Sequence, residues 1–529
     1  MARSRHLRVV RTGVALALLL IWAHSGLRAE PDDETLGKAL GYPFGENPAQ
    51  SYQERYRVGS WSAMDRVSGM PSRRVARADA ARPLLSAVGA PMIRYQYRGS
   101  TFSVDDYLER RRLTGLLILK NGEIVVERYR YGRTADARFL SFSMAKSVIS
   151  LLIGIAADKG LIASLDDKAE TYAKAFVGSP YGGTTIRHLL RMSSGLTFSE
   201  RYDGQDDVTR LTQAAYTGEP SIVDLLRNIS GRSAPEGEKF AYASSETEVL
   251  GRVLTGATGR TVSDLTSEWL WRPLGAEYDA FWLLAHDGQE RAYAYFNASL
   301  RDWGRLGALL ARDGRAEDRQ LIPRDYLIEA TDAQRQPPAF RPLRATPYFG
   351  YGYQFWLLPL SERTFALLGL HGQAIYVQPS SGIVMVQTAV NEQPSLNPDP
   401  EPYLEREAFW YGVLQSLGGS TADSGTASGP AAPPGFVASP EVYKVIAEND
   451  RYRVVAVTFR PNQRDQFHSH PMAAIYYMTD CSVRAFTPDG ASGSANITAG
   501  TVRIQDPVTA HSVENMGTSE CKVLMFETK

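Results

Sequence analysis

The sequence predicts an α+β domain followed by a small all-β domain, on three observations. Strand-like runs lie at 113–132 and return at 365–390, with amphipathic helical patterns between them. This order is typical of an α+β domain whose sheet contains strands from both ends of the segment. Residues 418–435 are almost all Gly, Ser, Thr, Ala and Pro, which indicates a linker. Beyond the linker, short strand-like runs separated by turn residues predict a small barrel or sandwich at 436–529.

These patterns set the domain boundaries. The α+β domain covers 106–417, and the linker joins it to the β domain. Residues 30–105 have few periodic runs. We expect them to form an N-terminal extension that packs on the α+β domain.

The first 29 residues predict a signal peptide. A basic stretch without acidic residues, 1–12, precedes an apolar run at 13–23 and small residues near a cleavage site after Ala29. The apolar run is too short to span a bilayer comfortably, although an uncleaved anchor is the alternative. We therefore expect a periplasmic or secreted protein with no stable membrane span after cleavage.

The charge balance bears on the kind of partner, and the cysteines bear on the oxidation state of the last domain. Lys plus Arg and Asp plus Glu number 58 each, so no net charge favours nucleic acid, and we expect a small-molecule substrate. The two cysteines, Cys481 and Cys521, both lie in the last domain. An oxidising compartment would let them pair, and two buried free thiols are the alternative.

The elements of the first domain follow from local signals. Two apolar runs flank Asn121-Gly122, which predicts a β-hairpin. Apolar residues recur at helical spacing over 143–160, and Gly160 is placed to end that helix. Similar patterns predict further helices at 184–196, 245–259 and 297–314.

A serine and a lysine lie three residues apart at the start of the helix predicted over 143–160. Ser143 falls at its N-terminus, and Lys146 follows one turn later on nearly the same face. A serine hydroxyl needs a nearby base to become a nucleophile, and a buried lysine can be that base. The alternative is an N-cap serine beside a solvated lysine. A second match to this spacing, Ser519 to Lys522, lies on a predicted strand of the last domain and is taken as chance.

Further segments follow the pair in a fixed order. They are "TTIRHLLRMSSGL", "GEKFAYASSETEVLGRVL", "NASLRDWGRLG", "GYGYQFWL" and "GLHGQAIYV". Over about 110–415, this order resembles the serine β-lactamase and penicillin-binding-protein superfamily. The similarity is to its class C-like branch, which includes esterases and 6-aminohexanoate-dimer hydrolases. The resemblance implies a β-lactamase/transpeptidase-like fold with an antiparallel sheet and a helical subdomain.

The resemblance also implies catalytic roles. Ser143 matches the nucleophile and Lys146 its partner in the Ser-x-x-Lys motif. Tyr242 matches the tyrosine of the Tyr-x-Asn motif, which acts as general base and acid. In this sequence Ser244 stands where that motif has asparagine.

The third motif departs further from the family pattern. Leu370-His371-Gly372-Gln373 lies where the family has Lys-Thr-Gly on a strand at the edge of the site. The resemblance implies an oxyanion hole formed by the backbone N–H groups of Ser143 and Gln373. His371 could bind substrate, tune Tyr242 or be structural, and His188 is expected to be structural. The missing lysine argues against an efficient β-lactamase or transpeptidase.

Three histidines of the last domain form a second candidate site. His468 and His470 are two apart, so on a strand they point to the same side, and His511 follows Pro507. These residues resemble the two motifs of the cupin family, a small β-barrel. The position of the cupin glutamate holds Ala474 or Ile475. Three imidazoles plus water can still bind zinc or a similar divalent metal, and an empty polar pocket is the alternative.

The favoured hypothesis is an exported serine hydrolase that cleaves an ester or amide through an acyl-enzyme without a cofactor. The cupin-like domain would be an accessory module. One alternative is a non-catalytic penicillin-binding-like receptor or sensor, and another is a β-lactamase or D-Ala peptidase. A third has the cupin-like domain as a metal-dependent isomerase or dioxygenase, which the missing glutamate weakens.

Overall fold

The chain divides into two compact units, Met1–Ser424 and Gly425–Lys529, and the division falls inside the segment 418–435. The computed structural model describes residues 30–89, 91–395, 399–422, 432–449, 451–486, 492–505 and 508–528. The signal peptide predicted at 1–29 lies outside these residues. No helix within the described ranges has both the length and the apolar character needed to cross a membrane.

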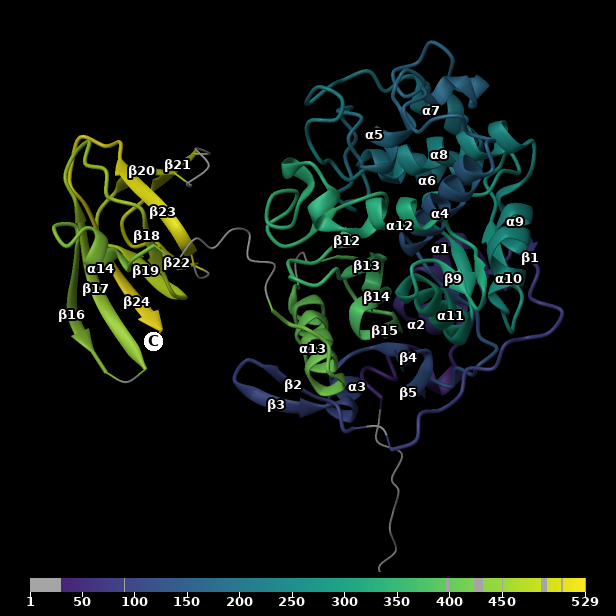
Figure 1. The fold of residues 1–529 in the computed structure, drawn as a ribbon, viewed down its shortest axis with the longest axis horizontal. Helices are drawn as coiled ribbons and strands as arrows, with labels where there is room; N and C mark the ends of the chain where they lie inside the picture. Colours follow the sequence, from purple (N-terminus) through teal and green to yellow (C-terminus); the bar gives the residue numbers. More distant parts are fainter. Residues whose placement is uncertain are drawn as a thin grey trace, which may run out of the picture. The chain divides into compact units, whose positions relative to one another are not determined.

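A seven-stranded antiparallel sheet lies at the centre of the first unit (Figure 1). In spatial order its strands are β11 (Gly350–Tyr351), β12 (Trp356–Leu357), β13 (Phe365–Leu368), β14 (Ala374–Gln378), β15 (Ile383–Ala389), β4 (Leu113–Lys120) and β5 (Glu123–Tyr129). β15 pairs with β4 from Ile383 to Ala389, so strands from the two ends of the domain are neighbours. The predicted α+β fold is confirmed.

The hairpin between β4 and β5 has the predicted turn. Asn121 and Gly122 adopt φ values of 53° and 86°. A two-residue hairpin turn whose twist matches the strands needs positive φ at both positions, which Asn and Gly adopt at little cost.

Helices cover both faces of the sheet (Figure 1). The unit contains α1 (Pro48–Ser51), α2 (Glu54–Ser60), α3 (Val104–Arg110), α4 (Met144–Asp158), α5 (Ile186–Leu190), α6 (Asp207–Thr217), α7 (Ile222–Arg227), α8 (Ser244–Thr258), α9 (Val262–Leu265), α10 (Arg272–Leu274), α11 (Leu300–Ala311), α12 (Arg324–Thr331) and α13 (Glu401–Leu417). The four helices predicted from sequence correspond to α4, α5, α8 and α11. α13 was not predicted, because buried Glu405 and Arg406 interrupt its apolar pattern.

Successive side chains of β4 point alternately into two hydrophobic cores. Leu117 and Leu119 belong to the core that contains α4, α8 and α11. Leu116 and Ile118 face the opposite core, which contains α13. Successive side chains of a strand point to opposite faces, so one strand supplies both cores.

The N-terminal extension is part of the first unit. Its strand β1 (Ser72–Val75) joins β7 (Ala280–Leu283), β8 (Phe296–Ala298) and β6 (Phe139–Leu140) in a four-stranded sheet. Trp61 of the extension packs edge-on against Phe142, with 5.0 Å between ring centroids, beside the start of α4. Two short hairpins complete the unit: β2 (Arg94–Tyr97) with β3 (Ser100–Ser103), and β9 (Arg315–Ala316) with β10 (Arg319–Gln320).

The second unit is all-β apart from the short helix α14 (Gly435–Ala438). One sheet contains β16 (Tyr443–Glu448), β17 (Tyr452–Phe459), β24 (Cys521–Thr528), β19 (Ala473–Tyr477) and β22 (Val502–Gln505). The other contains β18 (His468–His470), β23 (Val508–Asn515), β20 (Cys481–Phe486) and β21 (Ser492–Ile497). The predicted all-β class is confirmed, and of the two states considered for the cysteines the structure has the disulfide Cys481–Cys521.

The prediction that Ser519 lies on a strand is wrong. Ser519 does not lie on a strand but in the bend that precedes β24, and only Lys522 belongs to the strand. Lys522 pairs with Glu520 at 2.9 Å. This second Ser-x-x-Lys match therefore lacks the helix start that distinguishes the first.

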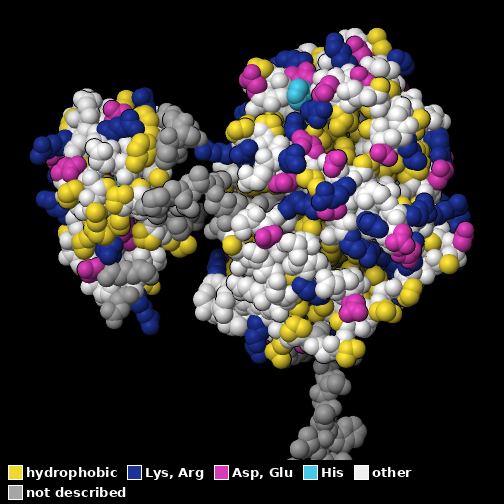
Figure 2. Space-filling view, in the orientation of Figure 1, with side chains coloured by type: hydrophobic (Ala, Val, Ile, Leu, Met, Phe, Trp, Pro, Cys, Tyr) yellow, Lys and Arg dark blue, Asp and Glu magenta, His cyan; other side chains and the backbone are white. Residues whose placement is uncertain are grey.

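Basic and acidic side chains are interspersed over the visible face of the first unit (Figure 2). This distribution agrees with the equal numbers of the two charge types in the sequence.

Candidate active site

Ser143 and Lys146 meet at the N-terminus of α4. Ser143 is the residue immediately before the helix, and Lys146 lies within its first turn. The Lys146 side chain is buried, and its Nζ donates a hydrogen bond to Ser143 Oγ at 2.9 Å. The pair therefore has the contact that proton transfer from the serine hydroxyl requires.

Burial changes the proton affinity of Lys146. It lowers the pKa of the amine to about 8, against the attraction of the Glu200 carboxylate, which raises it. The same Nζ donates to the Ser244 hydroxyl at 3.0 Å and to the Tyr293 carbonyl at 2.7 Å. A substantial fraction of the amine is therefore neutral at slightly alkaline pH, and three acceptors fix its position.

Tyr242 lies beside this pair, just before α8. Its ring stacks on Trp356 with 5.3 Å between centroids, and Lys146 Nζ lies 5.1 Å from the ring centre. Burial holds the pKa of Tyr242 well above its usual value, and the charge of Glu200 acts in the same direction. A hydrogen bond with Ser143 acts in the opposite direction. Tyr242 is therefore protonated at neutral pH and can donate a proton next to Ser143.

Glu200 also belongs to the hydrogen-bond network around Lys146, and no sequence pattern predicted it. Its carboxylate accepts hydrogen bonds from the Ser244 backbone N–H at 2.7 Å and from the Ser244 hydroxyl at 2.8 Å. It also accepts one from the Tyr202 hydroxyl at 2.6 Å. Ser244 thus links Lys146 to a carboxylate. Glu200 lies in an irregular segment between α5 and α6, without a motif that would mark it.

A cavity of about 840 Å³ opens in front of Ser143. Its wall includes Ser143, Ser244, Glu200 and His371. Six aromatic residues contribute to the remaining wall: Tyr52, Phe142, Tyr202, Tyr216, Tyr293 and Tyr295. No Lys or Arg is among the described residues that line it. The cavity thus suits a largely apolar substrate without a negative charge.

The three histidines of the second unit also meet. One ring nitrogen from each of His468, His470 and His511 lies within 4.8 Å of the others. The Nδ1 atoms of His468 and His470 face acceptors, the Gln466 carbonyl and the Glu527 carboxylate, both at 2.8 Å. These contacts favour protons on both Nδ1 atoms, so two Nε2 lone pairs face each other across 2.7 Å. The buried Nε2 of His511 has no hydrogen-bond partner among the described residues.

This donor set fits a metal ion. Neutral imidazole nitrogens are ligands of zinc, and a carboxylate or carbonyl on the other ring nitrogen is the usual outer partner. Glu527 supplies one such partner from β24, a position that the sequence pattern did not indicate.

A family model described as Beta-lactamase matches residues 103–407. The chain belongs to the beta-lactamase family. The match contains Ser143, Lys146, Tyr242, Ser244 and the third-motif segment. The chain is accordingly a hydrolase related to serine β-lactamases.

One curated protein and two solved structures are similar to parts of this beta-lactamase-family chain. The 6-aminohexanoate-dimer hydrolase of Paenarthrobacter ureafaciens is 25% identical over 388 residues, covering 71% of this chain and 94% of that one. The solved structure of a "Putative 6-aminohexanoate-dimer hydrolase from Bacillus anthracis" has 23% identity and a TM-score of 0.63, covering 71% of this chain and 97% of that one. A solved cupin domain from Bordetella pertussis aligns with the C-terminal part at 24% identity and a TM-score of 0.16, covering 19% of this chain and 99% of that one.

The third motif of this beta-lactamase-family chain lies in a turn rather than on a strand. Leu370–Gly372 form the turn between β13 and β14, where His371 adopts φ 56°. Its Nδ1 contacts the Asn391 carbonyl at 2.8 Å, and its ring packs against Trp61 at 4.8 Å between centroids. Burial lowers the pKa of His371 to about 3, so the ring is neutral. His371 is thus held by the protein and also lines the cavity.

Gln373 and His188 lie apart from the cavity wall. The Gln373 side chain is buried and hydrogen-bonds to both backbone groups of Ala389, at 2.6 and 3.1 Å. Its backbone N–H contacts the Leu370 carbonyl at 3.5 Å, so its place in an oxyanion hole stays a prediction. His188 pairs with Glu236 at 2.6 Å, as a structural histidine does.

Proposed function

We propose that the first unit cleaves an ester or a small amide bond through an acyl-enzyme on Ser143. The observation that carries this proposal is the 2.9 Å contact between Ser143 and buried Lys146, whose pKa is lowered to about 8. A lysine with the ordinary pKa of 10.5 would have almost no neutral amine near pH 8, whereas Lys146 has a substantial neutral fraction there.

In the proposed reaction, neutral Lys146 takes the proton of Ser143 Oγ as the oxygen attacks the substrate carbonyl carbon. The carbonyl oxygen becomes an oxyanion, which the Ser143 N–H and the dipole at the start of α4 stabilise. The family resemblance predicts the Gln373 N–H as second donor, which requires it to leave the Leu370 carbonyl. Tyr242 gives its proton to the leaving alkoxide or amine and recovers one from Lys146. Water then attacks the acyl-enzyme by the same steps in reverse, releasing a carboxylic acid and free Ser143.

The cavity favours esters and neutral amides over β-lactams. A β-lactam carries a carboxylate, and the described lining of the cavity offers it no Lys or Arg. The aromatic walls suit an apolar acyl chain instead. The relative from Paenarthrobacter ureafaciens, named as a 6-aminohexanoate-dimer hydrolase, supports hydrolysis of a small molecule.

A fluorophosphonate probe followed by mass spectrometry of the labelled peptide tests this proposal. The expected label is on Ser143, with p-nitrophenyl ester hydrolysis lost in proportion to labelling. A label on Ser519, or full activity in the labelled protein, would refute the assignment.

We further propose that His468, His470 and His511 bind one divalent metal ion such as zinc, and that the chain is exported by residues 1–29. The orphaned Nε2 of His511 and the facing Nε2 atoms of the other two histidines support the metal site. Metal analysis of purified protein should find one zinc per chain, and His511→Ala should remove it. The hydrolase needs no metal in this mechanism, so EDTA should leave ester hydrolysis unchanged.

A further inference from the structure

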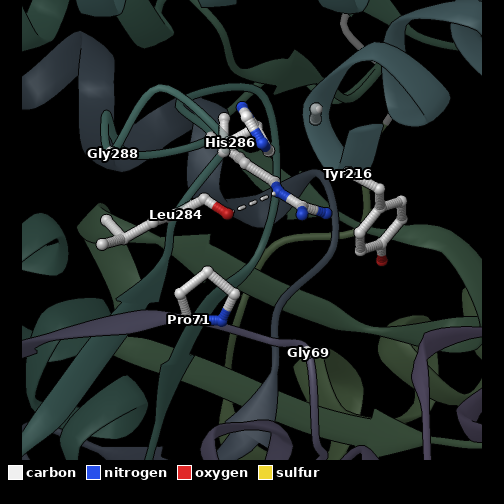
Figure 3. A pocket seen from close by; sticks show the side chains of 9 residues that line it. Gly69, Pro71, Tyr216, Leu284, His286 and Gly288 are labelled. Atoms are coloured by element: carbon white, nitrogen blue, oxygen red, sulfur yellow. Dashed lines mark hydrogen bonds between the residues drawn. The ribbon is translucent and has the colours of Figure 1, made fainter. Parts of the chain in front are cut away.

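A second cavity, of about 310 Å³, lies between three segments of the first unit (Figure 3). Gly69 and Pro71 come from the segment before β1, and Tyr216 from the end of α6. Leu284, His286 and Arg291 come from the loop between β7 and β8. Figure 3 shows these side chains around one open space, with Tyr216 and Leu284 on opposite sides.

Arg291 is the only charged side chain among the described residues of this lining, and it is 1% exposed. The other buried arginines of the unit each pair with a carboxylate: Arg191 with Glu329, Arg305 with Asp302, and Arg406 with Glu407. Arg291 forms no ion pair within the part of the chain that the structure describes. A guanidinium cannot lose its proton in a protein, so its charge stays buried without a counter-ion.

The contacts of Arg291 satisfy the guanidinium only in part. Nε donates to the Leu284 carbonyl at 3.1 Å, the contact drawn as a dashed line in Figure 3. The guanidinium carbon lies 3.9 Å from the centre of the Tyr216 ring and 5.3 Å from that of Tyr295. Nη1 is buried and has no hydrogen-bond partner of normal geometry among the described residues, and the Tyr216 hydroxyl likewise has none. Burial lowers the pKa of Arg291, but interaction of the guanidinium with the Tyr216 hydroxyl raises it. The buried guanidinium of Arg291 therefore lacks both a counter-ion and a full set of hydrogen bonds. Burying an unpaired charge in this way costs free energy of folding.

We propose that this cavity binds a short-chain carboxylate through Arg291. The planar guanidinium matches a carboxylate, which can accept two parallel hydrogen bonds from it. The rest of the lining is largely apolar, from Pro71, Ala215, Leu284 and Ala285, and it suits a small hydrocarbon tail rather than a fully hydrated ion. The volume is at the lower end of the range of ~300–1,000 Å³ for small-molecule sites. Tyr216 lines both this cavity and the one in front of Ser143, but Arg291 belongs to this cavity and has no part in the proposed reaction.

Isothermal titration with hexanoate and hexanamide tests the proposal on the wild-type protein in chloride-free buffer. The two probes have nearly the same shape, but only hexanoate is charged. Hexanoate should bind at least about tenfold more tightly than hexanamide, because only the anion forms charge-assisted hydrogen bonds. Equal affinities, or inorganic phosphate binding as tightly as hexanoate, would overturn it.

Three variants test whether hexanoate binds in this cavity. Arg291→Gln should lose hexanoate affinity by at least about tenfold and should not lower the melting temperature, since it removes an unpaired buried charge. Ala285→Leu should lose affinity by filling the cavity while Arg291 remains. Lys146→Ala should bind hexanoate as the wild type does. Loss of hexanoate binding in Lys146→Ala, or full binding in Arg291→Gln, would place the anion elsewhere and refute the site.

Discussion

Lys146 donates a hydrogen bond to the Ser244 hydroxyl across 3.0 Å, at the position where the family motif has asparagine. The Ser244 hydroxyl in turn donates to Glu200 at 2.8 Å. Ser244 thus links the catalytic amine to a carboxylate through two hydrogen bonds.

Removing this link should slow the reaction. Ser244→Ala is expected to lower kcat for p-nitrophenyl esters by about tenfold or more, since a hydrogen bond to a charged group contributes ~1.5–3 kcal/mol. KM should change little, because the hydroxyl acts through Lys146. Ser245→Ala is the matched control, since Ser245 is buried one residue later and contacts Tyr181 instead. Equal losses in the two variants would indicate a structural effect.

Ser143→Ala should lower ester hydrolysis by at least about a thousandfold, the scale expected for loss of a nucleophile. Ser519→Ala should keep full activity, because Ser519 lies in a bend of the second unit. Steady-state kinetics with p-nitrophenyl acetate measures both. Substantial turnover by Ser143→Ala would mean that another residue forms the acyl-enzyme.

The pH dependence of kcat/KM should report Lys146. Activity should rise with pH through about 8, because the neutral amine is the base and burial lowers its pKa to that value. Glu200→Gln removes the carboxylate that raises this pKa, so the midpoint should move to lower pH. Exposed Glu238→Gln is the control and should leave the midpoint unchanged. A shift to higher pH in Glu200→Gln would contradict the electrostatic assignment.

Ester hydrolysis should exceed β-lactam hydrolysis. Parallel assays with nitrocefin and p-nitrophenyl esters should give a much lower kcat/KM for nitrocefin, since the described cavity lining has no cation for its carboxylate. A nitrocefin efficiency near ~10⁷ M⁻¹ s⁻¹, high in the range of enzymes, would show that other groups recognise the β-lactam.

Glu246 should make the stability of the first unit depend on pH. Burial raises its pKa to about 8, against the hydrogen bonds from Ser194, which lower it. The folded state therefore binds a proton that the unfolded state loses above its ordinary pKa of 4.5. The resulting stability is fully present below pH 4.5 and is lost as pH rises through about 8.

Glu246→Gln should reduce this loss. Thermal unfolding at pH 5 and pH 8 should show a smaller decrease in melting temperature for the variant than for the wild type. Glu238→Gln should behave as the wild type. An unchanged decrease in Glu246→Gln would mean that another group titrates.

The sequence predicted the parts of the site that local patterns encode. Ser143 and Lys146 are joined by one helical turn, and Tyr242 precedes a helix with a clear apolar stripe. Their roles came from the order of the motifs along the chain, which resembles that of the family. Glu200 and Arg291 could not be assigned in this way. Each reaches its position from an irregular loop, and its role depends on neighbours that tertiary packing alone brings together. Buried Glu405 interrupts the apolar pattern of α13 for a similar reason, because its partners Arg110 and Arg111 lie far away in the chain.

The packing of α13 on the hairpin β2–β3 has a consequence for how the first unit folds. Tyr95 of β2 packs against Phe409 of α13 at 5.3 Å between centroids, and its hydroxyl hydrogen-bonds to Glu405 at 2.7 Å. This contact joins residues more than three hundred positions apart in the sequence, so its contact order is high. Forming it costs the conformational entropy of closing a long loop. During synthesis the aromatic face of the hairpin cannot pack on α13 until α13 has been translated. Apolar surface exposed in this way before folding is the kind that chaperones protect from aggregation.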